Sequence, residues 1–395
     1  MDYNFKTRAI HSGQVEKNPF HALNPPIFQT STFTFEDLDH ADAVMDFRST
    51  DYVYTRGNNP TLRLLENRIA DLEEGKGAVA FSSGMGAISS VLISLLKPND
   101  EVIFHKTLYG SAYSFITEVL KKYGIIGRMV DLTDLEAFKK SITGKTKVVY
   151  FESPSNPDLS IIDIRKVSEI ASEHSVKVVV DNTFMTPYLQ RPLTLGADVV
   201  VHSATKYLSG HGDVVAGLAI AKDENYINEL KFGTMCEFGS VMSPFNAWLI
   251  LRGIKTLPIR MREHSKNAQA IAEYLEKSDK ILKVNYPGLS SHKGHEVHKS
   301  QADGNSGVIS FEFKGGLEAA KKFVNSLKLF KIAVSLGDTE SLVEVPAILT
   351  HRGYPAEELE KFGLTESMVR FSVGLEDVED LIRDIDLAFK AIGGE

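Results

Sequence analysis

The sequence predicts an α/β protein with a doubly wound, mostly parallel sheet and a smaller C-terminal α+β domain. Short, continuous apolar runs recur along the first 256 residues, which is typical of strands buried on both faces. Segments with apolar residues at helical spacing separate most of these runs, and strands that alternate with helices form parallel sheets. After about residue 256 the runs give way to strict apolar–polar alternation, which indicates strands with one solvent-exposed face.

Length and composition exclude several classes of protein. With 395 residues the chain can hold two domains around a well-buried core. A net charge of −8 argues against nucleic acid or an anionic membrane as the main partner, and no apolar stretch approaches the length of a membrane span. The N-terminus lacks the apolar segment of a secretory signal. The single cysteine, Cys236, cannot form an internal disulfide, so we expect a reducing, cytoplasmic setting.

Residues 1–58 are predicted to form an extended N-terminal arm. They contain several glycines and prolines and show little sustained periodicity. Such a segment has no core of its own, so it must lie on the body of its own chain or on a neighbouring subunit. Its end, from Tyr52 to Pro60, carries two tyrosines and an arginine but taken alone is more typical of a solvated loop than of a site.

Residues 59–256 are predicted to form the larger domain. Apolar residues at helical spacing indicate a helix from Thr61 that ends at Gly75, and a second helix is expected over 87–96. The predicted strands are the apolar runs at 78–81, 102–104, 148–151, 178–180 and 199–201. Because ligands bind at the carboxyl ends of the strands in such sheets, polar residues at those ends are the candidate site residues.

The turn from Ser82 to Gly86 is one such candidate. It follows a strand and opens a helix, so its backbone N–H groups could hold a phosphate at a helix N-terminus. It also resembles half of a dinucleotide fingerprint, but Ser89 replaces the third glycine and the next strand ends in Phe104-His105 rather than in an acid. A dinucleotide site is therefore disfavoured, and the sequence has no G-x-x-x-x-G-K-[ST] phosphate loop.

The strand at 199–201 leads into Ser203, Thr205 and Lys206. A lysine just after a buried strand is costly to keep as an unpaired ammonium, so we expect its pKa to fall. Only the neutral amine attacks a carbonyl, which is what a Schiff-base lysine requires, and two hydroxyls beside it suit a phosphate. From this stretch alone, a lysine that simply reaches solvent is an equal alternative.

Two further polar residues end neighbouring strands. Asp181 follows the strand at 178–180 and lies one strand–helix–strand step before Lys206, so we expect both side chains at the same edge of the sheet. An acid there can bond a protonated ring nitrogen, although a helix N-cap is the simpler interpretation. Asn156, after the strand at 148–151, is typical of a turn when taken alone.

Residues 257–395 are predicted to form the smaller domain with a mixed or antiparallel sheet. Apolar and polar residues alternate at 309–313 and 369–373, and a last helix has apolar residues at core spacing from Val378. Arg370 lies on the polar side of its strand, so by itself it is expected to be exposed. The alternative is that it clamps a carboxylate.

His292, His295 and His298 invite a metal hypothesis. Their spacing does not match H-E-x-x-H, and lysines and glycine surround them. We therefore expect a solvated segment and no metal.

Motifs spread over nearly the whole chain match a known family. They are YTRGNNPT at 54–61, SSGMGA at 82–87, TLYG at 107–110, ESPSNP at 152–157, VVVDNTFMTPYLQRPLTLGAD at 178–198, SATKYLSGHGD at 203–213, RGIKTL at 252–257 and VRFSVGLED at 369–377. Together they resemble the pyridoxal-phosphate enzymes of cysteine and methionine metabolism. The resemblance implies fold type I, the cofactor pyridoxal 5′-phosphate, a small amino-acid substrate and a homotetramer built from two dimers.

The resemblance also assigns catalytic roles. It implies that Lys206 carries the cofactor covalently and moves protons. Asp181 would keep the pyridine nitrogen protonated, so that the ring acts as an electron sink. Tyr109 would stack on the ring and act as acid or base near the leaving group.

The remaining predicted residues would bind the cofactor or the substrate. Tyr54 and Arg56 of a neighbouring subunit would bind the phosphate, together with Gly84, Met85, Ser203 and Thr205. Asn156 would bond the ring hydroxyl. Arg370 and the region of Ser335 would take the α-carboxylate of the substrate.

A few positions bear on the choice of substrate. Family members that act on cystathionine typically carry a glutamate where this chain has Val53 and another where it has Val334, so nothing obvious would hold the distal end of cystathionine. The sulfhydrylases of the family usually carry a C-terminal insertion that this chain lacks. Ser111 stands where methionine γ-lyases usually carry a cysteine, and it is predicted to lie near the leaving sulfur. Their Lys-Asp pair falls at about Met235-Cys236.

These features predict a γ-eliminating lyase, most similar to methionine γ-lyase. The alternatives are a cystathionine γ-lyase or γ-synthase, or γ-replacement of the O-acetylhomoserine sulfhydrylase type. A non-catalytic relative of the fold is a further alternative, against which the presence of both Lys206 and Asp181 argues.

Overall fold

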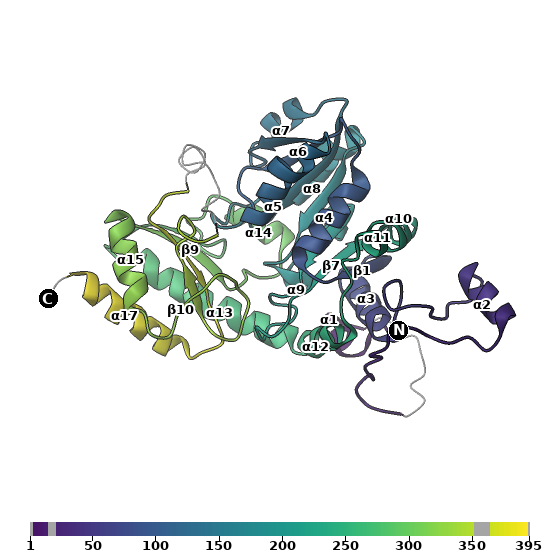
Figure 1. The fold of residues 1–395 in the computed structure, drawn as a ribbon. Coiled ribbons are helices and arrows are strands. Elements are labelled where there is room, and N and C mark those ends of the chain that lie inside the picture. The colour runs from purple at the N-terminus through teal and green to yellow at the C-terminus, as the bar shows by residue number, and fades with distance from the viewer. Residues whose placement is uncertain (1–2, 15–20, 351–363, 394–395) are drawn as a thin grey trace.

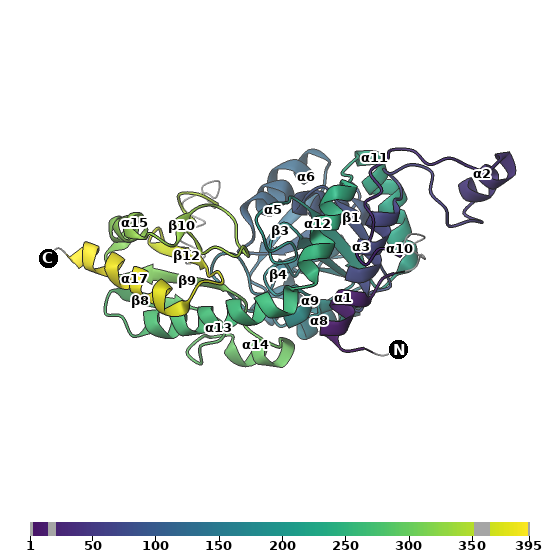
Figure 2. The ribbon, with the colours of Figure 1, turned by 90° about the horizontal axis from the view of Figure 1, so that it is seen from below.

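The computed structural model describes residues 3–14, 21–350 and 364–393. Over these ranges it contains a seven-stranded and a five-stranded sheet, each covered by helices (Figure 1). The two sheets follow one another along the long axis of the molecule, with the C-terminus at one end and the N-terminal segment at the other (Figure 2).

The larger sheet has the strand order β1-β7-β6-β5-β4-β2-β3. The strands are β1 (Gly77–Phe81), β2 (Glu101–His105), β3 (Ile126–Val130), β4 (Thr146–Glu152), β5 (Lys177–Asp181), β6 (Val199–Ser203) and β7 (Gly217–Ala221). All neighbours are parallel except β7, which is antiparallel to β1 and β6. The mostly parallel sheet is confirmed. The sequence analysis missed β3 and β7, since glycines and small residues weaken their apolar signal.

Helices cover both faces of this sheet, which makes it doubly wound. One face packs on α4 (Gly84–Leu95) and α5 (Gly110–Ser114). The other packs on α3 (Pro60–Leu72), α8 (Ile164–Glu173) and α12 (Pro244–Ile254). The α3 helix begins as expected, because the Asn59 side chain caps it and Pro60 occupies its first turn. In α4 the Ser83 hydroxyl accepts the N–H of Gly86, so this helix begins at Gly84 rather than at residue 87.

The smaller sheet has the strand order β10-β11-β12-β9-β8. The strands are β8 (Ile281–Asn285), β9 (Val308–Phe313), β10 (Lys331–Ile332), β11 (Leu342–Glu344) and β12 (Met368–Ser372). The sheet is mixed, since β10 and β11 are parallel and the other pairs are antiparallel. Its apolar core packs on α13 (Leu257–Glu276), α15 (Gly316–Ser326) and α17 (Val378–Gly393).

The expectation of a solvent-exposed face on this sheet is wrong. Every residue of β9 and β12 is buried, including the polar Ser310 and Glu312. The polar face is covered because Arg370 reaches Asn156, in the loop after β4 of the larger sheet, and Ser372 bonds the backbone of Gly337. The alternation of apolar and polar residues therefore indicates a polar face here, but that face is not exposed to solvent.

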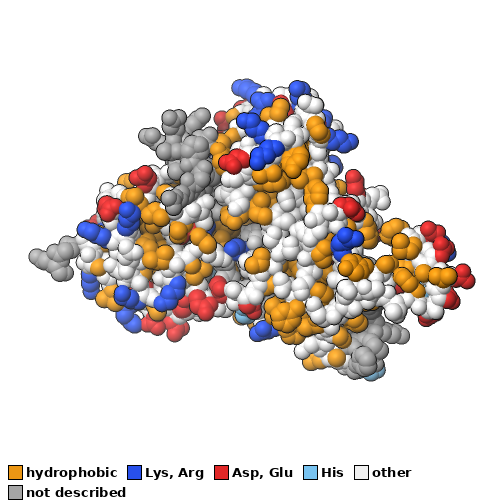
Figure 3. Space-filling model, in the orientation of Figure 1, with side chains coloured by type: hydrophobic (Ala, Val, Ile, Leu, Met, Phe, Trp, Pro, Cys, Tyr) orange, Lys and Arg blue, Asp and Glu red, His pale blue; other side chains and the backbone are white. Residues whose placement is uncertain are grey.

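The arm is not wholly extended, which corrects the expectation for residues 1–58. It contains α1 (Phe5–His11), which packs on α3 through the buried Ala9, and α2 (Leu38–Met45). Two turns offer too few positions for a helical period to show in the sequence. The α2 segment stands away from the body in both views and exposes apolar side chains (Figures 1–3). The division of the chain at residues 58 and 256 stays a prediction.

Candidate active site

A cavity of about 260 Å³ lies where the carboxyl ends of β4, β5 and β6 meet the start of α4 and the segment before β11. Most of the residues singled out in the sequence line it: Gly84, Met85, Tyr109, Asn156, Asp181, Ser203, Thr205, Lys206, Ser335 and Arg370. The larger sheet brings the strand-end residues to one edge, as expected. The smaller sheet supplies Arg370 and the neighbouring segment supplies Ser335.

Lys206 projects into the cavity just after β6. Its Nζ atom donates a hydrogen bond to Oγ of Ser335 at 2.7 Å. Burial, together with the charge of Arg370, lowers the pKa of Lys206 to about 8, although Glu344 opposes this shift. The expected fall in the lysine pKa is confirmed, and a useful fraction of the amine is neutral near pH 7.

Two buried carboxyls stand side by side near the lysine. Asp181 ends β5 and Glu152 ends β4, and the two are register partners in the parallel pair. Burial raises the pKa of both, and the charge of Asp181 raises that of Glu152 further. Asp181 is stabilised as an anion by the N–H of Thr183 in a turn, and it does not cap α9 (Thr186–Leu189), so the helix N-cap interpretation is wrong. The repulsion between the two carboxyls therefore favours a neutral Glu152, while Asp181 is the ionised member that can pair with a cation.

Glu152 is a site residue that the sequence analysis missed. Its Oε1 accepts the backbone N–H of Tyr109 at 2.8 Å, and its Oε2 accepts that of Asn156 at 3.2 Å. It thus ties together the two loops that carry these residues. The sequence does place Glu152 at the end of a buried strand. Only the fold shows that a second loop reaches this side chain.

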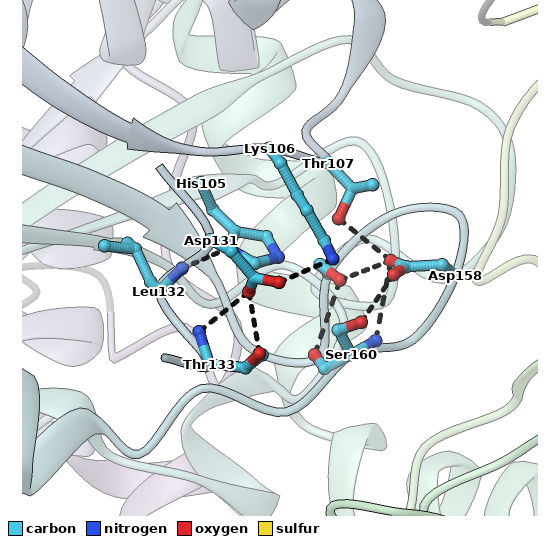
Figure 4. Close-up of polar contacts among 9 residues, drawn as sticks. His105, Lys106, Thr107, Asp131, Leu132, Thr133, Asp158 and Ser160 are labelled. Atoms are coloured by element: carbon cyan, nitrogen blue, oxygen red, sulfur yellow. Dashed lines mark hydrogen bonds and ion pairs between the residues drawn. The ribbon is translucent and has the colours of Figure 1, made fainter. Parts of the chain in front are cut away.

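Asp158 also joins these two loops (Figure 4). Its Oδ1 accepts the hydroxyls of Thr107 at 2.9 Å and Ser155 at 2.6 Å, and its Oδ2 accepts that of Ser160. Burial opposes ionisation, but His105 and these hydroxyls outweigh it and lower the pKa of Asp158. The loop before Tyr109 is therefore anchored by two carboxyl groups, Glu152 and Asp158.

The start of α4 forms a cradle for an anion. A Cβ added to Gly84 would lie 2.8 Å from Cβ of Ser203, so no side chain fits between this helix and β6. The N-terminus of a helix carries a partial positive charge, and its first backbone N–H groups have no partner within the helix. Ser203, which contacts Gly84, and Thr205 also line the cavity. The Thr205 hydroxyl also exchanges hydrogen bonds with the backbone of Ala216.

Arg370 is 3% exposed, so the expectation of exposure is wrong and the clamp alternative gains support. Its Nη1 donates to Oδ1 of Asn156 at 2.8 Å, and its Nη2 donates to the carbonyl oxygen of Ser335 at 2.9 Å. Ser335 has a positive φ of 130°, which is unfavourable for a residue with a Cβ. Its strained backbone places the hydroxyl toward Lys206 and the carbonyl toward Arg370.

The chain does not bring every predicted residue to this cavity. Tyr54 and Arg56 line a different cavity of about 640 Å³, together with Cys236. Ser111 is exposed in the first turn of α5 and is not among the residues that line the main cavity. Val334 does line the main cavity.

We expected all three histidines to lie in a solvated segment, but this is true of only some of them. His298, in α14 (His295–Gln301), is buried and bonds the carbonyl oxygen of Gly304, so that expectation is wrong for it. Within the described residues, no group of three or more His, Cys, Asp or Glu side chains could hold a metal ion. Nor is any helix in the described ranges long and apolar enough to cross a bilayer.

The donor set of the main cavity fits pyridoxal 5′-phosphate. Lys206 supplies an amine with a lowered pKa, Asp181 a buried carboxylate, and Tyr109 a ring that is 40% exposed beside the cavity. The α4 N-terminus supplies an anion cradle. These features suit an aldehyde, a pyridine nitrogen, an aromatic ring and a phosphate, respectively.

This arrangement is that of a fold-type I pyridoxal-phosphate enzyme. The chain belongs to the Cys/Met metabolism PLP-dependent enzyme family, whose model matches residues 6–390.

Individual relatives are similar over nearly their full length. The chain is 47% identical to an L-methionine gamma-lyase of Pseudomonas putida over 388 residues, which cover 98% of this chain and 97% of the relative. It is 46% identical to a cystathionine beta-lyase of Lactococcus lactis subsp. cremoris, with 98% of both chains covered. Among solved structures, a Campylobacter jejuni chain with N′-pyridoxyl-lysine-5′-monophosphate superposes with a TM-score of 0.94 at 34% identity, covering 98% of this chain and all of that one.

Proposed function

We propose that this chain is a methionine γ-lyase, which converts L-methionine and water into methanethiol, 2-oxobutanoate and ammonia. The observation that carries the proposal is the single cavity in which Lys206, Asp181, Tyr109 and Arg370 meet. The similarity to curated L-methionine gamma-lyases supports it.

Each residue of the cavity has its own role in this reaction. Bound pyridoxal 5′-phosphate would supply the electron sink for charge that develops next to the α-carbon. Lys206 would hold the cofactor until the amine of the substrate displaces it. The freed amine would then take the proton from Cα, pass it on to the cofactor, and take a second proton from Cβ. Asp181 keeps the pyridine nitrogen protonated. Arg370 binds the α-carboxylate, and the Tyr109 phenol protonates the departing thiolate.

The choice of methionine over cystathionine rests on the lining of the cavity. Val334 is exposed to the cavity and cannot pair with the distal ammonium of cystathionine. Overall identity does not separate the two, since the L-methionine gamma-lyase and cystathionine beta-lyase relatives lie within one percentage point. Ser111 does not line the cavity of its own chain and so does not contribute to this choice.

We also propose that the sites are shared between two subunits and that two such dimers form a tetramer. Tyr54 and Arg56 do not line the main cavity of their own chain. In the proposed dimer they complete the phosphate site of the partner. The single cysteine supports a cytoplasmic enzyme.

The test is a product analysis of the purified enzyme with its cofactor. L-methionine, L-homocysteine, cystathionine and O-acetylhomoserine are compared by kcat/KM, with 2-oxobutanoate and the released thiol measured separately. We expect L-methionine to give both products in equal amounts. Higher kcat/KM for cystathionine, or incorporation of an added thiol in place of 2-oxobutanoate release, would support one of the alternatives.

A further inference from the structure

Arg370 already has a buried counter-charge within its own chain. Glu344 faces it across β11 and β12, where the two residues are direct cross-strand partners. Oε1 of Glu344 lies 3.0 Å from Nη1 of Arg370, and the two side chains are 1% and 3% exposed. Solvent and salt therefore screen this pair very little.

The fold holds Glu344 in this position. The Thr350 hydroxyl donates to its Oε1 at 2.8 Å. Its Oε2 is buried without a hydrogen-bond partner among the described residues. A buried carboxylate in this state is costly unless a nearby charge offsets it, and Arg370 is the charge in contact.

The other contacts of Arg370 do not neutralise its positive charge, so Glu344 is the group that balances it. Asn156 and the carbonyl of Ser335 are neutral acceptors. The influence of Glu344 extends to Lys206 as well, where it opposes the effect of Arg370. Before a substrate binds, Glu344 thus offsets the charge of Arg370.

We propose that Glu344 sets the affinity of the carboxylate subsite by neutralising Arg370. The inference rests on the proposed function only in that the carboxylate of an amino-acid substrate binds Arg370. An incoming carboxylate has to share the guanidinium with Glu344, so it binds more weakly than it would to an unpaired arginine. The same weakening applies to the carboxylate of a 2-oxo acid product and favours its release.

The decisive variant is Glu344→Gln, which keeps the shape and an acceptor for Thr350 but removes the charge. We expect KM for L-methionine and Ki for 2-oxobutanoate each to fall about tenfold, with kcat changed less than about threefold. Glu344→Met, a second uncharged variant, should show the same fall. Unchanged or higher KM in variants that fold by circular dichroism would overturn the proposal, because it would mean that Glu344 only orients Arg370.

Two control variants distinguish the effect of charge from the effect of side-chain shape, and a change in the site from a change on the nearby surface. Glu344→Asp keeps the charge, so its KM should stay within about threefold of the wild type. Glu340→Gln removes an exposed carboxylate from the same region and should change neither constant.

A ligand without a carboxylate tests whether the change in affinity arises at the carboxylate subsite. The amine 3-(methylthio)propylamine lacks the carboxyl group of methionine, so Glu344→Gln should leave its Ki unchanged. An equal gain for this amine would contradict a carboxylate effect. Should the wild type prefer another amino acid to methionine, the same ratios are measured with that substrate, since all the candidates carry an α-carboxylate.

Discussion

At the scale of single residues, the reactivity of this site depends on where Lys206 is placed. Its amine stands at the end of a buried strand, next to Arg370 and away from bulk water, and its pKa is lowered to about 8. The hydroxyl of Ser335 holds the amine by a single hydrogen bond, which leaves it free to react. Neutral amine is therefore available near neutral pH, unlike that of an ordinary surface lysine.

This placement predicts how the cofactor-free enzyme takes up pyridoxal 5′-phosphate. Below a pKa of about 8 the neutral fraction of Lys206 rises about tenfold per pH unit. We expect the rate of covalent attachment, followed by absorbance, to rise accordingly from pH 6 to 7 and to level off above pH 8. Lys206→Ala should abolish attachment and turnover without unfolding the protein, whereas Lys222→Ala, at an exposed position, should change neither. A borohydride-fixed label on any other lysine would refute the assignment.

At the scale of elements, two loops at the carboxyl edge of the larger sheet are locked together. Glu152 binds the backbone of both loops, and Asp158 binds their hydroxyls. These contacts determine where Tyr109 and Asn156 stand. Small shifts in such loops cost activity, because catalytic groups have to be held within fractions of an ångström.

Removing the Asp158 carboxylate should therefore affect both stability and catalysis. Asp158→Ala leaves three hydroxyls without their acceptor, and we expect the free energy of unfolding to fall by about 2–3 kcal/mol. We also expect kcat/KM to fall about tenfold as the loop of Tyr109 loosens. Denaturant unfolding and steady-state kinetics measure the two effects. A destabilised variant with wild-type kcat/KM would show that Asp158 does not position the site.

The neighbouring Asp131 provides a matched control. It pairs with Lys106 at 2.7 Å in the same cluster, but that pair is partly exposed, and Asp131 bonds Lys106 and Thr133 rather than Thr107, Ser155 or Ser160 (Figure 4). Asp131→Ala should cost less than about 1 kcal/mol and leave kcat/KM unchanged. Because the pKa of Asp158 is lowered in the folded state, its stabilising effect is present above about pH 4 and is lost as the pH falls further. The difference between wild type and Asp158→Ala should shrink accordingly in acid.

At the scale of the whole molecule, the part of the arm around α2 stands out for its exposed apolar side chains. Leu38 and Phe47 are 87% and 74% exposed, and α2 lies away from the body (Figure 2). Such apolar exposure is typical of a surface that another chain covers. The proposed shared site gives that surface a function, because it places Arg56 at the cofactor of the partner.

Shared sites predict complementation between inactive variants. Arg56→Ala and Lys206→Ala each lack one part of every site, but a hybrid dimer has one site with both parts intact. Mixing the two under conditions of subunit exchange should restore up to about a quarter of wild-type activity, because half of the dimers are hybrids and each has one intact site. Mass spectrometry verifies the exchange, and mixing Lys206→Ala with itself is the control. Exchange without recovery would argue against shared sites.

The amino-acid sequence by itself determined the class of fold and most of the residues that line the site. The strands of the larger sheet are continuous apolar runs, and the polar residues that follow them reach one edge because parallel strands all end there. Local pattern therefore placed Lys206, Asp181 and the turn before α4 at this edge, although by itself it left a solvent-exposed lysine and a helix N-cap as alternatives. Motif resemblance, which reaches across the chain, added Arg370 and Ser335.

Only the tertiary structure decided which polar residues are buried and which of them meet. Alternation along β12 shows that Arg370 is on the polar face, but its burial depends on Asn156, which lies far away in the sequence. The ties made by Glu152 and the pairing of Glu344 with Arg370 likewise join separate segments. A sequence pattern reports the polarity of each position. The solvation and partners of that position depend on how the two sheets pack, which no local pattern contains.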